Sequence, residues 1–303
     1  MTTPFPAPHK SLLSRFLPLL LLSLSLSACS SPADNSNTGS GGAGSAAPGT
    51  ASTASTETAS APASTKAGAP ATDGACMDRI RKDGLRVLTS PDYPPYESMN
   101  DQNEIVGFEV DLVNAVAKEM GVEAKFTGQG FDGLIPALLA GRGDLIVSGL
   151  SVTPERAKSV AFTEPYEKSS NALVARADNS DINGSDSLKG KRVGVQLGTV
   201  QADIAAGIEG ADVRSFNISS DALAALKAGQ IDALLTDTPV AQDYVKANSD
   251  LRTAGEIEGG DKAMAAQLSC TDLVSELNTA LAKLQQSGEV ERMQKQWFTE
   301  KTQ

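Results

Sequence analysis

Residues 143–166 read GDLIVSGLSVTPERAKSVAFTEPY and combine a short apolar run with a turn and the start of a second element. Its apolar run, residues 145–147, is short and is bounded on both sides by glycine. Such a run is typical of a strand that is buried on both faces of a parallel sheet. The stretch therefore predicts an α/β architecture built on a parallel sheet.

The second half of this stretch predicts a helix start. Thr153 is a favoured N-cap residue, Pro154 suits the first helical position, and Arg156 then falls in the first turn. A helix N-terminus and a guanidinium together favour a bound carboxylate. The alternative is a capped surface helix on which Arg156 is simply solvated.

A second segment repeats this pattern. Residues 137–149, ALLAGRGDLIVSG, align with residues 225–237, ALKAGQIDALLTD, and share Ala, Leu, Ala, Gly and Asp in register. Each copy ends a helix at a glycine and enters a strand after an aspartate. Two copies predict two similar lobes, since a solenoid needs at least three shorter repeats.

The repeat places Gly149 and Asp237 at equivalent carboxyl ends of two strands, where open α/β sheets bind ligands. One lobe then presents Arg156 and the other presents Asp237. A cation and an anion that face each other across a cleft complement a zwitterion, which suggests an α-amino acid as ligand. The alternative is that Asp237 caps the helix that follows it.

Seven sequence blocks then follow one another in a fixed order. They are LRVLTSPDYPPYE (85–97), GFEVDLVNAVAKEMGV (107–122), FDGLIPALLAGRGDLIVSGLSVTPER (131–156), AFTEPY (161–166), LKGKRVGVQLGT (188–199), ALKAGQIDALLTD (225–237) and LQQSGEVERMQKQWF (284–298). In these blocks the chain resembles solute-binding protein family 3, the polar amino-acid-binding proteins of ABC importers.

This resemblance implies an α/β, two-lobed periplasmic-binding-protein-like type II fold with two hinge crossings and a ligand cleft between the lobes. Lobe 1 is expected to comprise residues 76–168 and 262–303, and lobe 2 residues 169–261. The implied mechanism is hinge closure on a polar L-amino acid, followed by delivery to an ABC transporter permease. The family serves several polar amino acids, and the sequence does not select among them.

The resemblance also implies the site residues. Arg156 is expected to take the ligand α-carboxylate, and Asp237 its α-ammonium. The side chains implied to flank the ligand are Tyr93 and Phe131. The implied hydroxyl and backbone contacts come from Ser148, Gly149, Ser151, Gly198 and Thr199. Gln196 is implied to line the pocket for the ligand side chain. Without the resemblance, Tyr93 and Phe131 are equally consistent with core packing, and the serines with ordinary loop positions.

Three departures from the family pattern concern selectivity. Val200 replaces a second hydroxyl after the Gly-Thr pair, and Ser90 stands where an aspartate is common, while Asp92 lies next to Tyr93. Segment 255–273 is shorter than usual and lacks the usual aromatic-glycine pair.

The first 28 residues read as a secretory signal peptide. Lys10 and Arg15 precede an apolar stretch, residues 16–26, that is too short to span a bilayer. LSAC (26–29) resembles the bacterial lipobox, which implies cleavage before Cys29 and lipidation of that cysteine. The alternative is a soluble secreted protein. A lipoprotein would be anchored to a membrane of the cell envelope, facing the periplasm or the extracellular side.

Residues 29–75 follow as Cys29 and a run of Ala, Ser, Thr, Gly and Pro that is nearly free of charge. Such a composition cannot bury a core, so we expect a disordered tether. Of the three cysteines, Cys76 and Cys270 then remain, and an exported protein with two thiols usually pairs them. The alternative is two buried free thiols.

Charge and histidine content exclude several functions. The net charge is −11, and loss of a leader that contains two basic and no acidic residues makes it more negative, which disfavours nucleic-acid binding. The one histidine, His9, lies in that leader, so Ser-His and Cys-His nucleophilic sites and histidine-ligated metals are excluded. Together with the family resemblance, this leads us to expect a binding protein without a metal or cofactor, and not an enzyme. We also expect it to be a monomer.

Two other functions remain open. The first is an amino-acid sensor module for a membrane signalling partner. The second is an enzyme that resembles the periplasmic dehydratases, with Glu97 or Glu164 as general acid.

Overall fold

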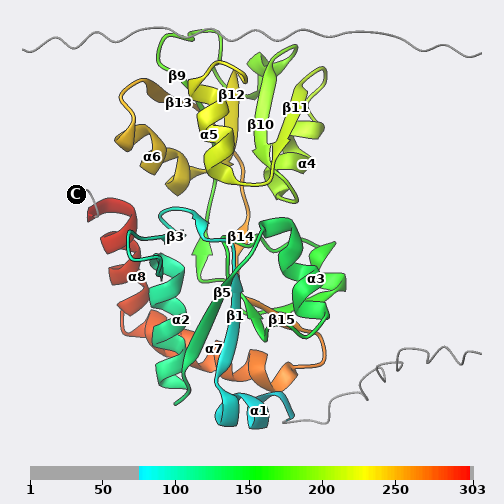
Figure 1. Cartoon of the computed structure of the whole chain (residues 1–303), viewed down its shortest axis with the longest axis vertical. Helices are drawn as coiled ribbons and strands as arrows, with labels where there is room; N and C mark the ends of the chain where they lie inside the picture. Colours follow the sequence, from blue (N-terminus) through cyan, green and yellow to red (C-terminus); the bar gives the residue numbers. More distant parts are fainter. Residues whose placement is uncertain (1–74, 301–303) are drawn as a thin grey trace, which may run out of the picture. The chain divides into compact units, whose positions relative to one another are not determined.

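The computed structural model describes residues 75–300, in which two five-stranded sheets share one arrangement (Figure 1). The first sheet has the order β5 (Ala124–Gly128), β1 (Leu85–Thr89), β6 (Leu145–Ile146), β15 (Ala265–Gln267) and β7 (Val160–Phe162). The second has the order β11 (Asp212–Phe216), β10 (Arg192–Gln196), β12 (Ala233–Asp237), β9 (Asn171–Arg176) and β13 (Leu251–Ile257). The predicted signal peptide and Cys29 lie outside the described residues, as does the predicted tether up to residue 74.

Strand directions match between the sheets. In each sheet the first three strands are parallel, and the fourth runs antiparallel to both of its neighbours. In the first sheet this fourth strand, β15, arrives from the far end of the sequence, after the second sheet is complete. The first sheet is therefore assembled from two separate parts of the chain.

Two short strands carry the chain between the sheets. β8 (Glu167–Lys168) leads from β7 to β9, and β14 (Asp261–Lys262) leads from β13 back to β15. The two pair antiparallel, with Lys262 opposite Glu167 and Asp261 opposite Lys168. This arrangement confirms the predicted two-lobed α/β fold with two crossings; the exact lobe boundaries remain a prediction.

Helices cover both faces of each sheet (Figure 1). Around the first sheet lie α1 (Ala75–Asp83), α2 (Phe108–Glu119), η1 (Phe131–Gly133), α3 (Leu134–Leu139), η2 (Arg156–Lys158), α7 (Thr271–Gln286), α8 (Glu289–Gln294) and the π-helix η4 (Lys295–Glu300). Around the second lie η3 (Ser185–Leu188), α4 (Val200–Ala206), α5 (Ser219–Lys227) and α6 (Thr238–Ala247). A small sheet, β2 (Asp92–Tyr93), β3 (Glu97–Met99) and β4 (Ile105–Val106), follows β1.

Alternate residues of β6 and its continuation pack on opposite faces of the sheet. Leu145 and Val147 join the core cluster that contains α2 and α7, whereas Ile146 joins the cluster beneath α3. All three are at most 1% exposed. The prediction of a strand buried on both faces is therefore confirmed.

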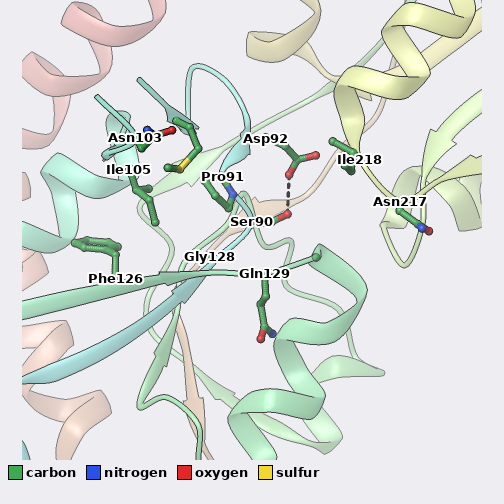
Figure 2. A pocket seen from close by; sticks show the side chains of 12 residues that line it. Ser90, Pro91, Asp92, Asn103, Ile105, Phe126, Gly128, Gln129, Asn217 and Ile218 are labelled. Carbon is green, nitrogen blue, oxygen red and sulfur yellow. Dashed lines mark hydrogen bonds between the residues drawn. The ribbon is translucent and has the colours of Figure 1, made fainter. Parts of the chain in front are cut away.

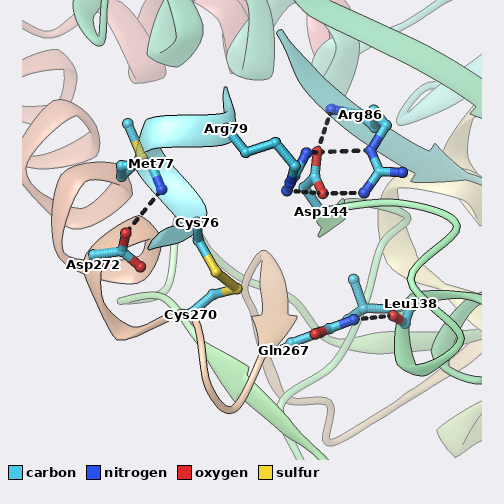
Figure 3. The surroundings of a disulfide bond; sticks show 9 residues. All are labelled: Cys76, Met77, Arg79, Arg86, Leu138, Asp144, Gln267, Cys270 and Asp272. Atoms are coloured by element: carbon cyan, nitrogen blue, oxygen red, sulfur yellow. Dashed lines mark hydrogen bonds and ion pairs between the residues drawn. A yellow bond between two sulfur atoms is a disulfide. The ribbon is translucent and has the colours of Figure 1, made fainter. Parts of the chain in front are cut away.

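The repeated aspartates make the same contact in both lobes. Asp144 accepts hydrogen bonds from the backbone N–H of Arg86 at 3.0 Å and from its Nε at 3.1 Å, and Asp232 does so from Arg192 at 2.9 and 3.0 Å. Arg79 of α1 adds a second guanidinium to Asp144 (Figure 3). Burial acts to raise the pKa of Asp144, but these hydrogen bonds hold it below its ordinary value. The repeated aspartates thus tie neighbouring parallel strands together.

Replacing the two aspartates with alanine is expected to have unequal effects. The Asp144 side chain is 3% exposed and the Asp232 side chain 19% exposed. Because buried hydrogen bonds to charged groups contribute about 1.5–3 kcal/mol, Asp144→Ala should lower the free energy of unfolding by about 2–3 kcal/mol and Asp232→Ala by about 1 kcal/mol. Urea denaturation at neutral pH measures both, and an equal or larger cost for Asp232→Ala would contradict this account.

A disulfide links Cys76 to Cys270, as predicted. It joins α1 to the residue that precedes α7, and the backbone N–H of Met77 donates to Asp272 Oδ2 at 2.8 Å beside it (Figure 3). α1 starts at Ala75, so the last residue of the predicted tether is helical. Within residues 75–300, no helix combines the length and apolar character needed to cross a bilayer.

Candidate functional site

The predicted site residues come together between the two sheets. Nine of them line one cavity with Val200 and Gln201: Tyr93, Phe131, Ser148, Gly149, Ser151, Arg156, Gln196, Thr199 and Asp237. The tenth, Gly198, contacts this cavity's Arg156 through its carbonyl oxygen. The cavity volume is about 10 Å³. That is room for about one water molecule, so an amino acid can enter only after side chains or lobes move.

Arg156 spans the two lobes. Its Nη1 donates to the Ser151 carbonyl at 2.7 Å, its Nη2 donates to the Gly198 carbonyl of the second lobe at 3.1 Å, and its guanidinium lies 5.5 Å from the ring centre of Phe131. Burial lowers its pKa. Among residues 75–300, no carboxylate lies within salt-bridge distance of it, and Asp203 and Asp237 act on it only at longer range. A desolvated guanidinium of this kind favours an external carboxylate.

The prediction of an α-helix that starts at Thr153 is wrong. The hydroxyl of Thr153 accepts a hydrogen bond from the Arg156 N–H at 3.1 Å, as a cap does. The segment, however, forms only the 3₁₀ turn η2, because β7 begins at Val160 and leaves no room for an α-helix. The contribution expected from a helix dipole is therefore small here, and the guanidinium carries the positive charge.

Asp237 lies opposite, at the end of β12. It occupies the N-cap position of α6, yet its side chain makes no capping hydrogen bond. Instead its Oδ2 accepts from the Tyr93 hydroxyl at 2.8 Å, and its Oδ1 lies 2.7 Å from Lys262 Nζ. The same Tyr93 hydroxyl accepts from the Asp237 N–H at 3.0 Å. The carboxylate thus points toward the cavity.

Lys262 is one of two residues near this site that the sequence did not predict. It lies in β14, and its Nζ also donates to Ser151 Oγ at 2.9 Å. Its side chain is 1% exposed. The available signal was a single lysine directly before the apolar run 263–266, in the segment that lacks the family's aromatic-glycine pair. Gln201, which donates to Asn171 at 2.8 Å, was missed as well.

Ser148 and Gly149 are held by buried carboxyl groups rather than left free. The Ser148 hydroxyl donates to Glu97 at 2.8 Å, and the Gly149 N–H donates to Glu109 at 2.8 Å. Gly149 has φ +53°, a conformation that favours glycine. Burial raises the pKa of both glutamates, and that of Glu97 is raised further by the neighbouring Glu109. These contacts fix the loop that carries the cavity wall.

Asp92 lies between this cavity and a second, larger one. Its Oδ2 accepts from Gln196 Nε2 at 3.1 Å and from the Ser219 N–H at 2.6 Å, and its Oδ1 accepts from Ser90 at 2.6 Å. It therefore contacts the second lobe through the predicted side-chain-pocket residue Gln196. The second cavity, of about 720 Å³, has both polar and apolar walls (Figure 2). Asp92 lines it together with Ser90, Ile218 and others.

Comparison with known proteins identifies relatives. The family model of bacterial extracellular solute-binding proteins, family 3, matches residues 85–300. The chain is 37% identical over 216 residues to ABC transporter arginine-binding protein 1 of Escherichia coli (strain K12), which covers 69% of this chain and 88% of that protein. It is 39% identical to a probable histidine-binding protein of Campylobacter jejuni, over 58% of this chain and 69% of that one. A solved structure of the P235GK mutant of ArgBP from T. maritima matches with a TM-score of 0.71 and 36% identity, covering 74% of this chain and 99% of the other.

Proposed function

This chain belongs to family 3 of the bacterial extracellular solute-binding proteins, and we propose that it captures a polar L-amino acid outside the cytoplasm and delivers it to the permease of an ABC transporter. The observation that carries this proposal is Arg156, a half-buried guanidinium with no carboxylate partner among the described residues, in the same cavity as Asp237. The ligand α-carboxylate binds Arg156, and its α-ammonium binds Asp237.

Hinge closure is the proposed mechanism. The contacts from Tyr93 to Asp237, from Arg156 to Gly198 and from Asp92 to Ser219 all join the two lobes. Because these contacts close a cavity of about 10 Å³, the ligand enters when they separate, and contacts regained on closure shift the population toward the closed form. β8 and β14 are the segments at which the lobes move.

The remaining parts of the proposal concern the cell envelope. A signal peptide over residues 1–28, lipidation of Cys29 and a tether up to α1 place the protein on a membrane, facing the periplasm or the extracellular side. It acts as a monomer and needs no metal, cofactor or catalytic step. Glu97 and Glu164, the general acids of the dehydratase alternative, are not among the residues that line the cavity of Arg156 and Asp237.

A thermal-shift screen tests the proposal. The protein is unfolded and refolded to remove bound ligand, and is then heated with each of the twenty amino acids, ornithine or cystine. A ligand at 100 times its Kd adds about 2.7 kcal/mol, which raises the midpoint by roughly 5–10 °C for a protein of this size. A rise confined to one or a few polar amino acids identifies the ligand, whereas no rise with any of them contradicts the proposed function.

A further inference from the structure

Lys262 occupies the position that an amino-acid ligand's ammonium needs. Its Nζ lies 2.7 Å from Asp237 Oδ1 and 2.9 Å from Ser151 Oγ, and both partners line the proposed ligand cavity. A carboxylate from one lobe and a hydroxyl from the other are the acceptors expected around a ligand α-ammonium. The side chains of Lys262 and Asp237 are 1% and 4% exposed, so this is a buried pair and not a surface contact.

We propose that Lys262 is an internal competitor for the ligand α-ammonium, which must displace the lysine from Asp237 before the lobes close on the ligand. This inference rests on the proposed function and adds a residue that sets affinity. Two ammonium groups at one buried carboxylate repel each other and leave an excess positive charge in the closed cleft, which disfavours binding of the ligand while Lys262 stays on Asp237.

A second buried acceptor is available to the displaced lysine. Glu167 lies directly opposite Lys262 in the β8–β14 pair, and residues paired in this way project on the same face. Glu167 Oε1 accepts from the Tyr96 hydroxyl at 2.9 Å, whereas its Oε2 is buried without a hydrogen-bond partner. Burial raises the pKa of Glu167 to about 8, and the charge of Lys262 acts in the opposite direction, as expected for neighbouring groups.

The location of this pair connects ligand binding to the hinge. Lys262 and Glu167 belong to β14 and β8, the two strands at which the chain crosses between the lobes. When the ligand ammonium binds Asp237, Lys262 leaves this residue at the end of β12 and pairs with Glu167 in β8, the other crossing strand. The approach of the Lys262 ammonium lowers the pKa of Glu167 and so favours its ionised form, which then serves as the counter-ion.

Lys262→Met tests the competition directly, because methionine keeps the apolar stem and removes the ammonium. In the parent, only the fraction of molecules in which Asp237 is free of Lys262 can bind the ligand ammonium, and this lowers the apparent affinity. The variant should therefore bind the amino acid about tenfold to a hundredfold more tightly than the parent, as measured by calorimetry. A matched carboxylic acid that lacks the α-amino group serves as control, and its affinity should change little. Weaker or unchanged amino-acid binding by the variant would overturn the inference.

Glu167→Gln is a second, independent test, in which amino-acid affinity should change in the opposite direction. Glutamine keeps the shape but cannot balance the displaced ammonium, so amino-acid affinity should fall by about threefold to tenfold while the parent's Lys262–Asp237 pair stays intact. If Lys262→Met fails to fold, this variant decides: unchanged affinity overturns the inference. Absence of binding to any amino acid would instead contradict the proposed function.

Discussion

Arg156→Ala is expected to weaken amino-acid binding by about 2–5 kcal/mol, which corresponds to roughly 30- to 5,000-fold in Kd. The guanidinium is half-buried, contacts two carbonyl groups and Phe131, and has no carboxylate partner within the described residues. A ligand carboxylate therefore supplies its counter-ion. Without Arg156, that carboxylate is buried in the closed cleft without a charged partner, and calorimetric titration with the ligand found in the screen measures the loss.

Two further variants control this experiment. Arg156→Lys should also bind weakly, because an ammonium lacks the planar fork that pairs with both carboxylate oxygens. Arg142→Ala changes an exposed arginine between α3 and β6 and should leave Kd unchanged. Thermal unfolding of each protein without ligand separates a loss of binding from a loss of folding. Parent-like affinity in a folded Arg156→Ala protein would refute the assignment of the carboxylate site.

The repeated segment explains why so much of the fold could be predicted. Residues 137–149 and 225–237 each end a helix, place an aspartate beside a neighbouring strand's arginine and enter a buried strand. These features depend on local sequence: a glycine after a helix, an aspartate and an apolar run. The same local signals placed Arg156 and Asp237 at the cavity, because Asp237 is the last residue of β12 and Arg156 lies in the segment after the carboxyl end of β6.

What could not be predicted depends on contacts between distant segments. Lys262 reaches Asp237 only because β14 pairs with β8 in one register, and no local pattern specifies that register. The hydrogen-bond partners of Ser148 and Gly149 could not be predicted for the same reason. These partners, Glu97 and Glu109, lie in local sequences that are equally compatible with exposed side chains. The turn at Thr153 was mistaken for a helix because its cap is genuine and only the early start of β7 shortens it.

The double variant Cys76→Ala/Cys270→Ala is expected to lower the free energy of unfolding by about 4–5 kcal/mol, and the midpoint by roughly 10–15 °C. The two cysteines are 194 residues apart in sequence, so the bond closes a loop that contains both sheets. In the chain-entropy account, a longer closed loop removes more conformations from the unfolded chain, and this loop is long. Thermal and guanidinium unfolding of the parent and the variant measure the difference.

The position of the bond predicts which properties should stay unchanged. It ties α1 to the start of α7, where Met77 also hydrogen-bonds to Asp272, and none of these residues lines the ligand cavity (Figure 3). Ligand affinity of the folded double variant should therefore match that of the parent. The parent treated with a reductant should unfold at the variant's midpoint, because both lack the same cross-link. If the double variant kept the parent's midpoint, contacts between α1 and α7 would hold the chain end in place without the disulfide, and the loop-closure argument would fail for this protein.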